Sequence, residues 1–192
     1  MRASLITFPA ALALAACVEV DMAIEVLGED EARVTGFMQM QRQMFEMSGG
    51  DDSFCPEEDG GTLTLTDTHA RCDFDKTGSY AEIVPSESSS DGPAEVEGEL
   101  TYLGDNRTRV FLPLAAMNAG MDEMGDDPQM LEMMRQMLTG MSVSFTVKGR
   151  EIESSTGTIS EDGSAATIML GIDDLIPPAA DRIGDFETIL RF

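Results

Sequence analysis

Sulfur atoms are the groups in this chain with the widest range of chemistry open to them. The sequence of 192 residues contains three cysteines, fifteen methionines and one histidine. A thiol can be acylated, oxidised to a disulfide or used as a metal ligand, and a thioether is a soft ligand suited to Cu(I). The sequence has no G-x-S-x-G or H-x-x-x-H motif and no glycine-rich phosphate loop, and one histidine leaves little for general-base catalysis. We therefore expect no enzymatic activity, no catalytic residue and no cofactor.

Cys17 has the surroundings of a lipidation site. Arg2 precedes an apolar run over residues 5–16, which is too short to span a bilayer. The sequence Leu14-Ala15-Ala16-Cys17 then resembles the lipobox of bacterial lipoproteins. That resemblance implies that residues 1–16 are a signal peptide that is removed, and that Cys17 carries acyl chains such as palmitate. Each buried methylene contributes about 0.8 kcal/mol, so two or three chains would hold the protein firmly on a membrane.

The residue after Cys17 indicates whether the anchor lies in the inner or the outer membrane. Val18 stands where an aspartate would resemble an inner-membrane retention signal. In an organism with two membranes, Val18 favours the periplasmic face of the outer membrane. We expect a lipid-anchored cell-envelope protein in which residues 17–192 form a single periplasmic domain. The alternative is an ordinary secretory signal that has a cysteine near its end by coincidence.

The chain is strongly acidic, with a net charge of −24. Removing Arg2, the only charged residue before Cys17, would change −24 to −25. Such a charge keeps the body soluble and repels nucleic acid and anionic headgroups. We expect no nucleic-acid partner, and the favoured electrostatic partners are protons, divalent cations or basic proteins. A solvated acidic surface with no partner is the simpler interpretation.

Cys55 and Cys72 form an even pair in a chain that is predicted to be exported. Oxidising compartments allow such pairs to close, so a Cys55–Cys72 disulfide is expected. Chain entropy predicts about 3 kcal/mol of stabilisation for a loop of this length. The alternative is a metal site of Cys55, Cys72 and His69, for which the fourth ligand of a structural zinc site is missing.

Alternation of apolar and polar residues predicts strands along most of the chain. Residues 18–26 alternate at nearly every step, and with residues 32–40 they predict a hairpin across a turn at residues 28–31. Because little chain separates Cys17 from this hairpin, we expect the domain to lie close against the membrane. Further strands are expected at residues 62–66, 70–74, 96–103, 108–112, 142–147, 155–159, 165–170 and 186–192.

Two methionine-rich segments have helical character. Residues 38–47 are rich in good helix formers and are followed by Ser48-Gly49-Gly50. Farther along, Asp127 can cap a helix, Pro128 suits its first position and Gly140 suits the position after its end. The expected fold class is therefore α+β, an antiparallel sheet of hairpins with one or two Met-rich helices packed on one face.

The methionines have three interpretations. They can simply fill the core, because the chain has no tryptophan and few other large apolar residues. They can instead wall a groove for an acyl chain or a partner helix, formed by Met130, Met134, Met137 and Leu138. They can also bind Cu(I), since i, i+3 spacing brings thioethers to one helical face in the pairs Met121 and Met124, Met130 and Met133, and Met134 and Met137. We expect non-catalytic binding of an amphiphilic ligand or an envelope partner, with Cu(I) sequestration as the alternative.

A family resemblance lies in the last third of the chain. Residues 143–157, with Gly149 and Gly157 in the turn, and the following Asp162-Gly163 resemble a strand–turn–strand of LppM-like bacterial lipoprotein domains. Those domains also begin with a hairpin directly after the lipidated cysteine. The resemblance carries no functional residue.

The chain departs from that family pattern at Lys148, where a proline is usual, and at Met169, where an aromatic residue is usual. The resemblance implies a non-catalytic envelope protein. Since some members of the family bind amphiphilic glycolipids, it also implies an apolar groove, which the Met-rich helix is expected to line.

Overall fold

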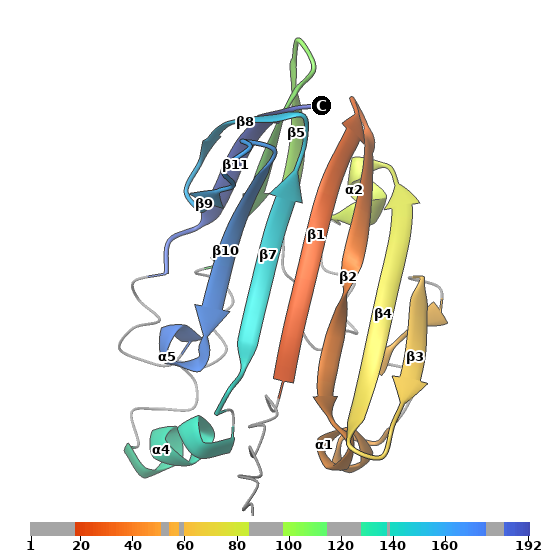
Figure 1. Ribbon diagram of the computed structural model, residues 1–192, viewed down its shortest axis with the longest axis vertical. Coiled ribbons are helices and arrows are strands. Elements are labelled where there is room, and N and C mark those ends of the chain that lie inside the picture. The colour runs from red at the N-terminus through yellow and green to blue at the C-terminus, as the bar shows by residue number, and fades with distance from the viewer. Residues whose placement is uncertain are drawn as a thin grey trace, which may run out of the picture.

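The computed structural model of the protein consists of two β-sheets with short helices at their margins (Figure 1). It describes residues 18–50, 54–57, 60–84, 98–114, 128–137, 139–175 and 183–192. The strands of the larger sheet are β1 (Val18–Gly28), β2 (Glu31–Gln41), β3 (Gly61–Leu65), β4 (His69–Gly78), β7 (Ser142–Lys148), β9 (Thr158–Ile159) and β10 (Ala165–Gly171). The strands of the smaller sheet are β5 (Glu99–Gly104), β6 (Arg107–Leu112), β8 (Glu151–Ser155) and β11 (Phe186–Arg191). The helices are α1 (Arg42–Met47), α2 (Tyr80–Ile83), α4 (Pro128–Met137) and α5 (Ile172–Leu175).

The larger sheet has the order β3-β4-β2-β1-β7-β10-β9, and the smaller sheet has the order β5-β6-β11-β8. Strand β1 lies in the middle of the larger sheet, where it pairs antiparallel with β2 and parallel with β7. The other pairings in both sheets are antiparallel. Hairpins of neighbouring strands therefore build most of the fold, and the parallel β1–β7 contact joins its first and last parts.

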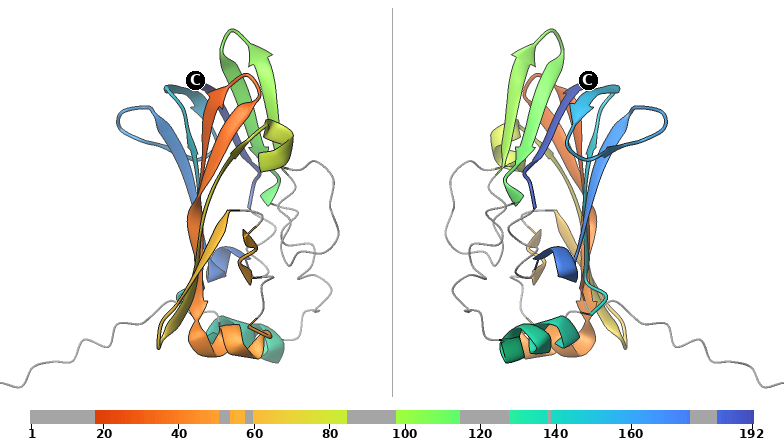
Figure 2. Two further views of the ribbon diagram at one scale, coloured as in Figure 1. Left: turned by 90° about the vertical axis from the view of Figure 1, so that its right-hand side faces the viewer. Right: turned by 90° about the vertical axis from the view of Figure 1, so that its left-hand side faces the viewer.

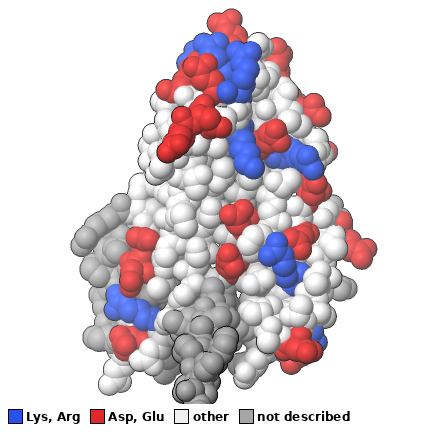
Figure 3. Space-filling view, in the orientation of Figure 1, with Lys and Arg blue, Asp and Glu red and all other residues white. Residues whose placement is uncertain are grey.

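Alternation along the strands separates the two faces of the larger sheet. On β1, Ile24 and Val26 are buried toward the smaller sheet, and Glu25 between them is exposed. Acidic side chains are spread over the outward face, and several of them lie next to basic ones (Figure 3). Two ion pairs on this face join Arg33 to Asp75 and Arg71 to Asp73.

The main core lies between the two sheets. Its most deeply buried apolar side chains include Val110, Leu114, Val147, Phe186 and Leu190, each at most 1% exposed. The smaller sheet covers the larger one only at the end away from Val18 (Figure 2). Dense packing is thus concentrated in one half of the molecule.

The chain passes between the sheets at Gly149 and Gly157, which bracket β8. A Cβ atom at Gly149 would lie 2.7 Å from the backbone oxygen of Arg191, and one at Gly157 would lie 2.6 Å from Cε2 of Phe186. Both crossings require a backbone without a side chain, because β11 lies directly against them. The two turn glycines of the LppM-like segment therefore have a packing role.

The predicted α+β class is wrong, because the protein is mostly β. Most expected strands are present, but the one expected at residues 155–159 is divided between β8 and β9, and residues 38–41, expected in a helix, continue β2. A second sheet, not a Met-rich helix, covers the inner face of the larger sheet. Helix α4 forms where expected, yet it lies with α1 at the end of the molecule where β1 begins (Figures 1 and 2). Among the described residues, no helix has the length and apolar character needed to cross a membrane.

Candidate functional site

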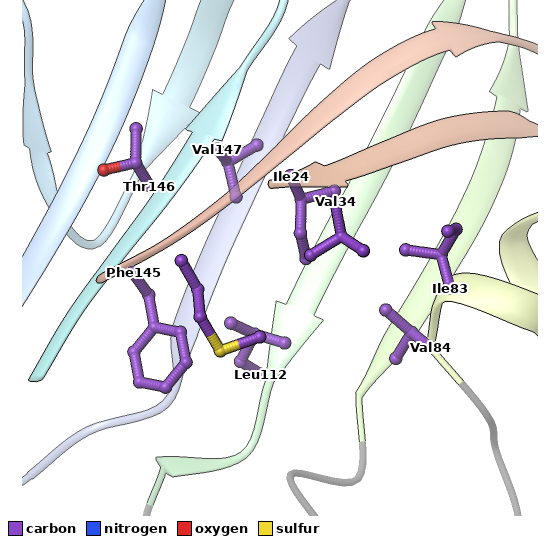
Figure 4. A pocket seen from close by; sticks show the side chains of 9 residues that line it. Ile24, Val34, Ile83, Val84, Leu112, Phe145, Thr146 and Val147 are labelled. Atoms are coloured by element: carbon purple, nitrogen blue, oxygen red, sulfur yellow. The ribbon is translucent and has the colours of Figure 1, made fainter. Parts of the chain in front are cut away.

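An apolar pocket lies between the two sheets (Figure 4). Its volume is about 70 Å³. Eight of the nine residues that line it are apolar, and Thr146 is the exception. The apolar lining residues are Met22, Ile24, Val34, Ile83, Val84, Leu112, Phe145 and Val147.

Strand register brings the wall of the larger sheet together. Ile24 lies opposite Val34 on β2 and opposite Val147 on β7, while Met22 lies opposite Phe145. Because directly opposite residues point to the same face of a sheet, these side chains form one continuous apolar surface. Ile24 and Val34 lie on the same side of the sheet as Leu112 of β6, and Thr146 points away from them (Figure 4).

Helix α2 supplies the third wall and is fixed at its start. The Ser79 N–H donates to Oε2 of Glu82 at 2.8 Å, as in a capping box, and the Ser79 hydroxyl donates to the same oxygen at 2.8 Å. These two hydrogen bonds hold the pKa of Glu82 below its usual value. The capped turn positions Ile83 and Val84 at the pocket.

Tyr80 ties α2 to both sheets. Its hydroxyl donates to the Gly28 carbonyl at 2.6 Å and lies 2.8 Å from Oγ1 of Thr108, a fully buried residue of β6. Burial raises the pKa of Tyr80, so the hydroxyl stays protonated and available as a donor. The pocket therefore has fixed walls on three sides.

Among the described residues that line the pocket, none carries an acid, a base or a thiol. No charged side chain lines it, and its one hydroxyl residue, Thr146, pairs with Thr167 at 3.0 Å between their Oγ1 atoms. Nowhere in the part of the chain that the structure describes do three or more His, Cys, Asp or Glu side chains gather as metal ligands. The described walls of the pocket are therefore apolar and uncharged.

A second buried group lies near the start of β1 and contains the disulfide. Cys55 and Cys72 are bonded, with their Cα atoms 5.5 Å apart, as predicted from the sequence. Phe45 of α1 is also buried there and lies edge-on to Phe54, with ring centroids 5.3 Å apart. This disulfide group fastens α1 to the base of the larger sheet.

The disulfide removes the alternative metal site. Both thiols are consumed by the bond, so His69 has no thiolate partner at Cys55 or Cys72. His69 lies at the start of β4, where its Nδ1 is 2.8 Å from Oγ1 of Thr68. His69 therefore contacts Thr68 of the neighbouring turn and does not form a metal site with Cys55 and Cys72.

For most of the other residues predicted for sites, the structure describes neither the residue nor its side chain. Cys17, Met121, Met124 and Leu138 are outside the described residues. Met130, Met134 and Met137 lie on α4, but their side chains are outside that description, and Met133 is 63% exposed. The groove and Cu(I) assignments therefore remain predictions from sequence.

Sequence reasoning missed the pocket. Alternation predicted the inward face of β1 and β7, but no local pattern pairs residue 24 with residue 147. Ile83 and Val84 lie on a helix of four residues, which is too short to give a periodic signal.

Comparisons with known proteins give one similar fold. No family model matches the chain, and no curated protein matches it. The NMR structure of the folded domain of the Mycobacterium tuberculosis LppM protein is similar, with a TM-score of 0.48 and 14% sequence identity. The match covers 92% of this chain and 90% of that one. It transfers no residue role to this chain.

Proposed function

We propose that the protein is a lipoprotein anchored to a membrane of the cell envelope by acyl chains on Cys17. We further propose that its pocket binds the apolar chain of an amphiphile without transforming it. The lipobox-like motif supports the anchor, and Val18 favours the periplasmic face of the outer membrane. The observation that carries ligand binding is the pocket, whose apolar walls come from both sheets and from α2.

The position of the pocket suits a ligand that comes from the membrane. Met22 follows Val18 by four residues, which is about 13 Å along a strand. One leaflet of a bilayer has about 15 Å of hydrocarbon thickness, which is the reach of a lipid chain. A chain extended from the membrane surface would therefore reach Met22, at the edge of the pocket nearest Val18.

The size of the pocket restricts the ligand. One water needs about 10–15 Å³ of such space, so about 70 Å³ admits a few methylene groups. The end of a single chain fits, whereas a ring system or a headgroup does not. We therefore favour single-chain amphiphiles, or one chain of a two-chain lipid.

Titration with cis-parinaric acid, a single-chain fatty acid whose own chain is fluorescent, tests this proposal. Ile83→Phe fills the pocket and is expected to weaken binding by at least about tenfold, equivalent to ~1.4 kcal/mol. Ile168→Phe is the matched control, because Ile168 packs partly buried against the same core but does not line the pocket. Equal binding by both variants, or none by the unchanged protein, would refute the ligand assignment. Native mass spectrometry of protein from its own membrane tests acylation of Cys17 separately.

A further inference from the structure

The end of the molecule where β1 begins exposes large apolar side chains. Strand β1 starts there at Val18, and both α1 and α4 lie at that end (Figures 1 and 2). Met47 at the end of α1 is 79% exposed, and Met133 on α4 is 63% exposed. Within the described part of the chain, these are two of the three most exposed large apolar residues. Large apolar side chains that are exposed near one another often mark a contact surface, and these two lie at the end where the chain continues to Cys17.

The same two helices lack the negative charge of the rest of the chain. Helix α1 contains one arginine and one glutamate, and so does α4, so each helix is neutral in a protein of net charge −24. Both arginines are paired: Arg42 Nε lies 2.7 Å from Glu46 Oε1, and Arg135 Nε lies 3.7 Å from Asp173 Oδ1. Anionic headgroups repel an acidic surface, but the two helices themselves add nothing to that repulsion.

Helix α1 is held in place before any contact is made. The Arg42 N–H donates to the Thr68 carbonyl at 2.8 Å, and Phe45 is buried in the disulfide group. The Ser48 hydroxyl donates to the Phe45 carbonyl at 2.9 Å. A surface that is already ordered loses little conformational entropy when it binds.

We infer that α1 and α4 form a membrane-contacting end, with Met47 and Met133 in the interfacial layer of the leaflet that holds the Cys17 acyl chains. This inference rests on the proposed lipid anchor and goes beyond it, because an anchor alone leaves the orientation of the body free. Flexible thioether side chains adapt to an irregular lipid surface. The strands of the larger sheet then stand away from the bilayer, and the pocket lies above it.

Site-directed labelling of the acylated, full-length mature protein tests the orientation. With Cys17 acylated and Cys55 bonded to Cys72, one introduced cysteine is the only free thiol. Met47→Cys and Met133→Cys are each labelled with an environment-sensitive fluorophore. Leu103→Cys is the matched control, because Leu103 is 42% exposed beside the β5–β6 turn at the opposite end. The proteins are bound to phosphatidylethanolamine–phosphatidylglycerol vesicles that contain a nitroxide-labelled lipid.

Labels at positions 47 and 133 are expected to shift to the blue and to be quenched severalfold more than the label at 103. Equal, water-like signals at all three positions on vesicle-bound protein would overturn the inference and leave the anchor intact. Burial of the labels in native membranes but not in protein-free vesicles would also overturn it, because the occupant would then be another protein. Absence of acyl chains in the mass spectrum would instead refute the proposed anchor.

Discussion

The two-sheet half and the disulfide end of this protein are stabilised by different means. Sixteen buried residues form one cluster that lies mainly between the sheets. Seven of them are at most 1% exposed: Ala32, Val110, Leu114, Val147, Ala166, Phe186 and Leu190. At the other end, the buried side chains outside that cluster include only Phe45, Cys55, Ala70 and Cys72 among the described residues.

The difference shows how one domain combines two sources of stability. Apolar burial stabilises in proportion to area, so it is effective where two sheets face each other. Where the sheet has only a short helix and a loop against it, little area is available. A covalent bond there lowers the entropy of the unfolded chain and supplies what packing does not.

Removing the largest fully buried side chain should break the two-sheet half. Phe186→Ala is expected to lower the free energy of unfolding by about 3–5 kcal/mol, through lost transfer energy and the cavity that remains. Urea unfolding followed by circular dichroism measures the change. Phe74→Ala is the control, because Phe74 is only half-buried and lies outside the main cluster. An equal loss in both variants would contradict the contrast between the two halves.

Removing the disulfide should weaken the opposite end. The double substitution Cys55→Ala, Cys72→Ala is expected to cost about 3 kcal/mol, as chain entropy predicts for a link between residues 17 apart. Amide hydrogen exchange should quicken first in α1, β3 and the start of β4. If β6 and β11 opened as early as α1, the two ends would be one cooperative unit, and the comparison would fail.

Tyr80→Phe should loosen the connection of α2 to both sheets. It removes one hydroxyl that bonds to Gly28 and Thr108, and it leaves the Thr108 hydroxyl buried without that partner. We expect a loss of about 1–3 kcal/mol, visible as a lower melting temperature. Tyr102→Phe removes an exposed hydroxyl bonded to Glu29 and should change the melting temperature little. Similar effects of the two variants would show that the buried link is unimportant.

The smallest expected effect is a pH dependence at the turn between β9 and β10. Hydrogen bonds from Ser160 and Ser164 lower the pKa of Asp162 from 3.8 to about 2. A lowered pKa in the folded state means that this contribution is present above about pH 4 and is lost as the pH falls toward 2. In Asp162→Asn, this part of the acid dependence of the melting temperature should disappear. An unchanged acid profile would show that the turn does not contribute.

Local sequence was enough to predict most strands and the disulfide. Alternation in residues 18–40 shows the β1–β2 hairpin, because one face of each strand is buried and the other is not. The disulfide followed from counting, since Cys55 and Cys72 are the pair left once Cys17 is assigned to lipid.

The fold class could not be predicted in the same way. An amphipathic pattern indicates that one face of an element is buried, but it does not indicate which other element covers that face. The pattern in residues 128–137 correctly predicted a helix, but it did not predict that a second sheet of β5, β6, β8 and β11 would cover the larger one. The resemblance around Gly149 and Gly157 marked a real feature, whose packing reason appears only when β11 lies against both glycines.

The amino-acid sequence by itself determined the strand pattern, the acidic charge, the cysteine pair and the motif at Cys17, because each depends on residues near one another or on composition. Only the tertiary structure decided that two sheets face each other, that an apolar pocket lies between them and that α1 and α4 share the end where β1 begins. These features depend on contacts between distant segments, such as the pairing of residue 24 with residue 147. Such pairings are selected by the packing of the whole chain, and no local pattern encodes them.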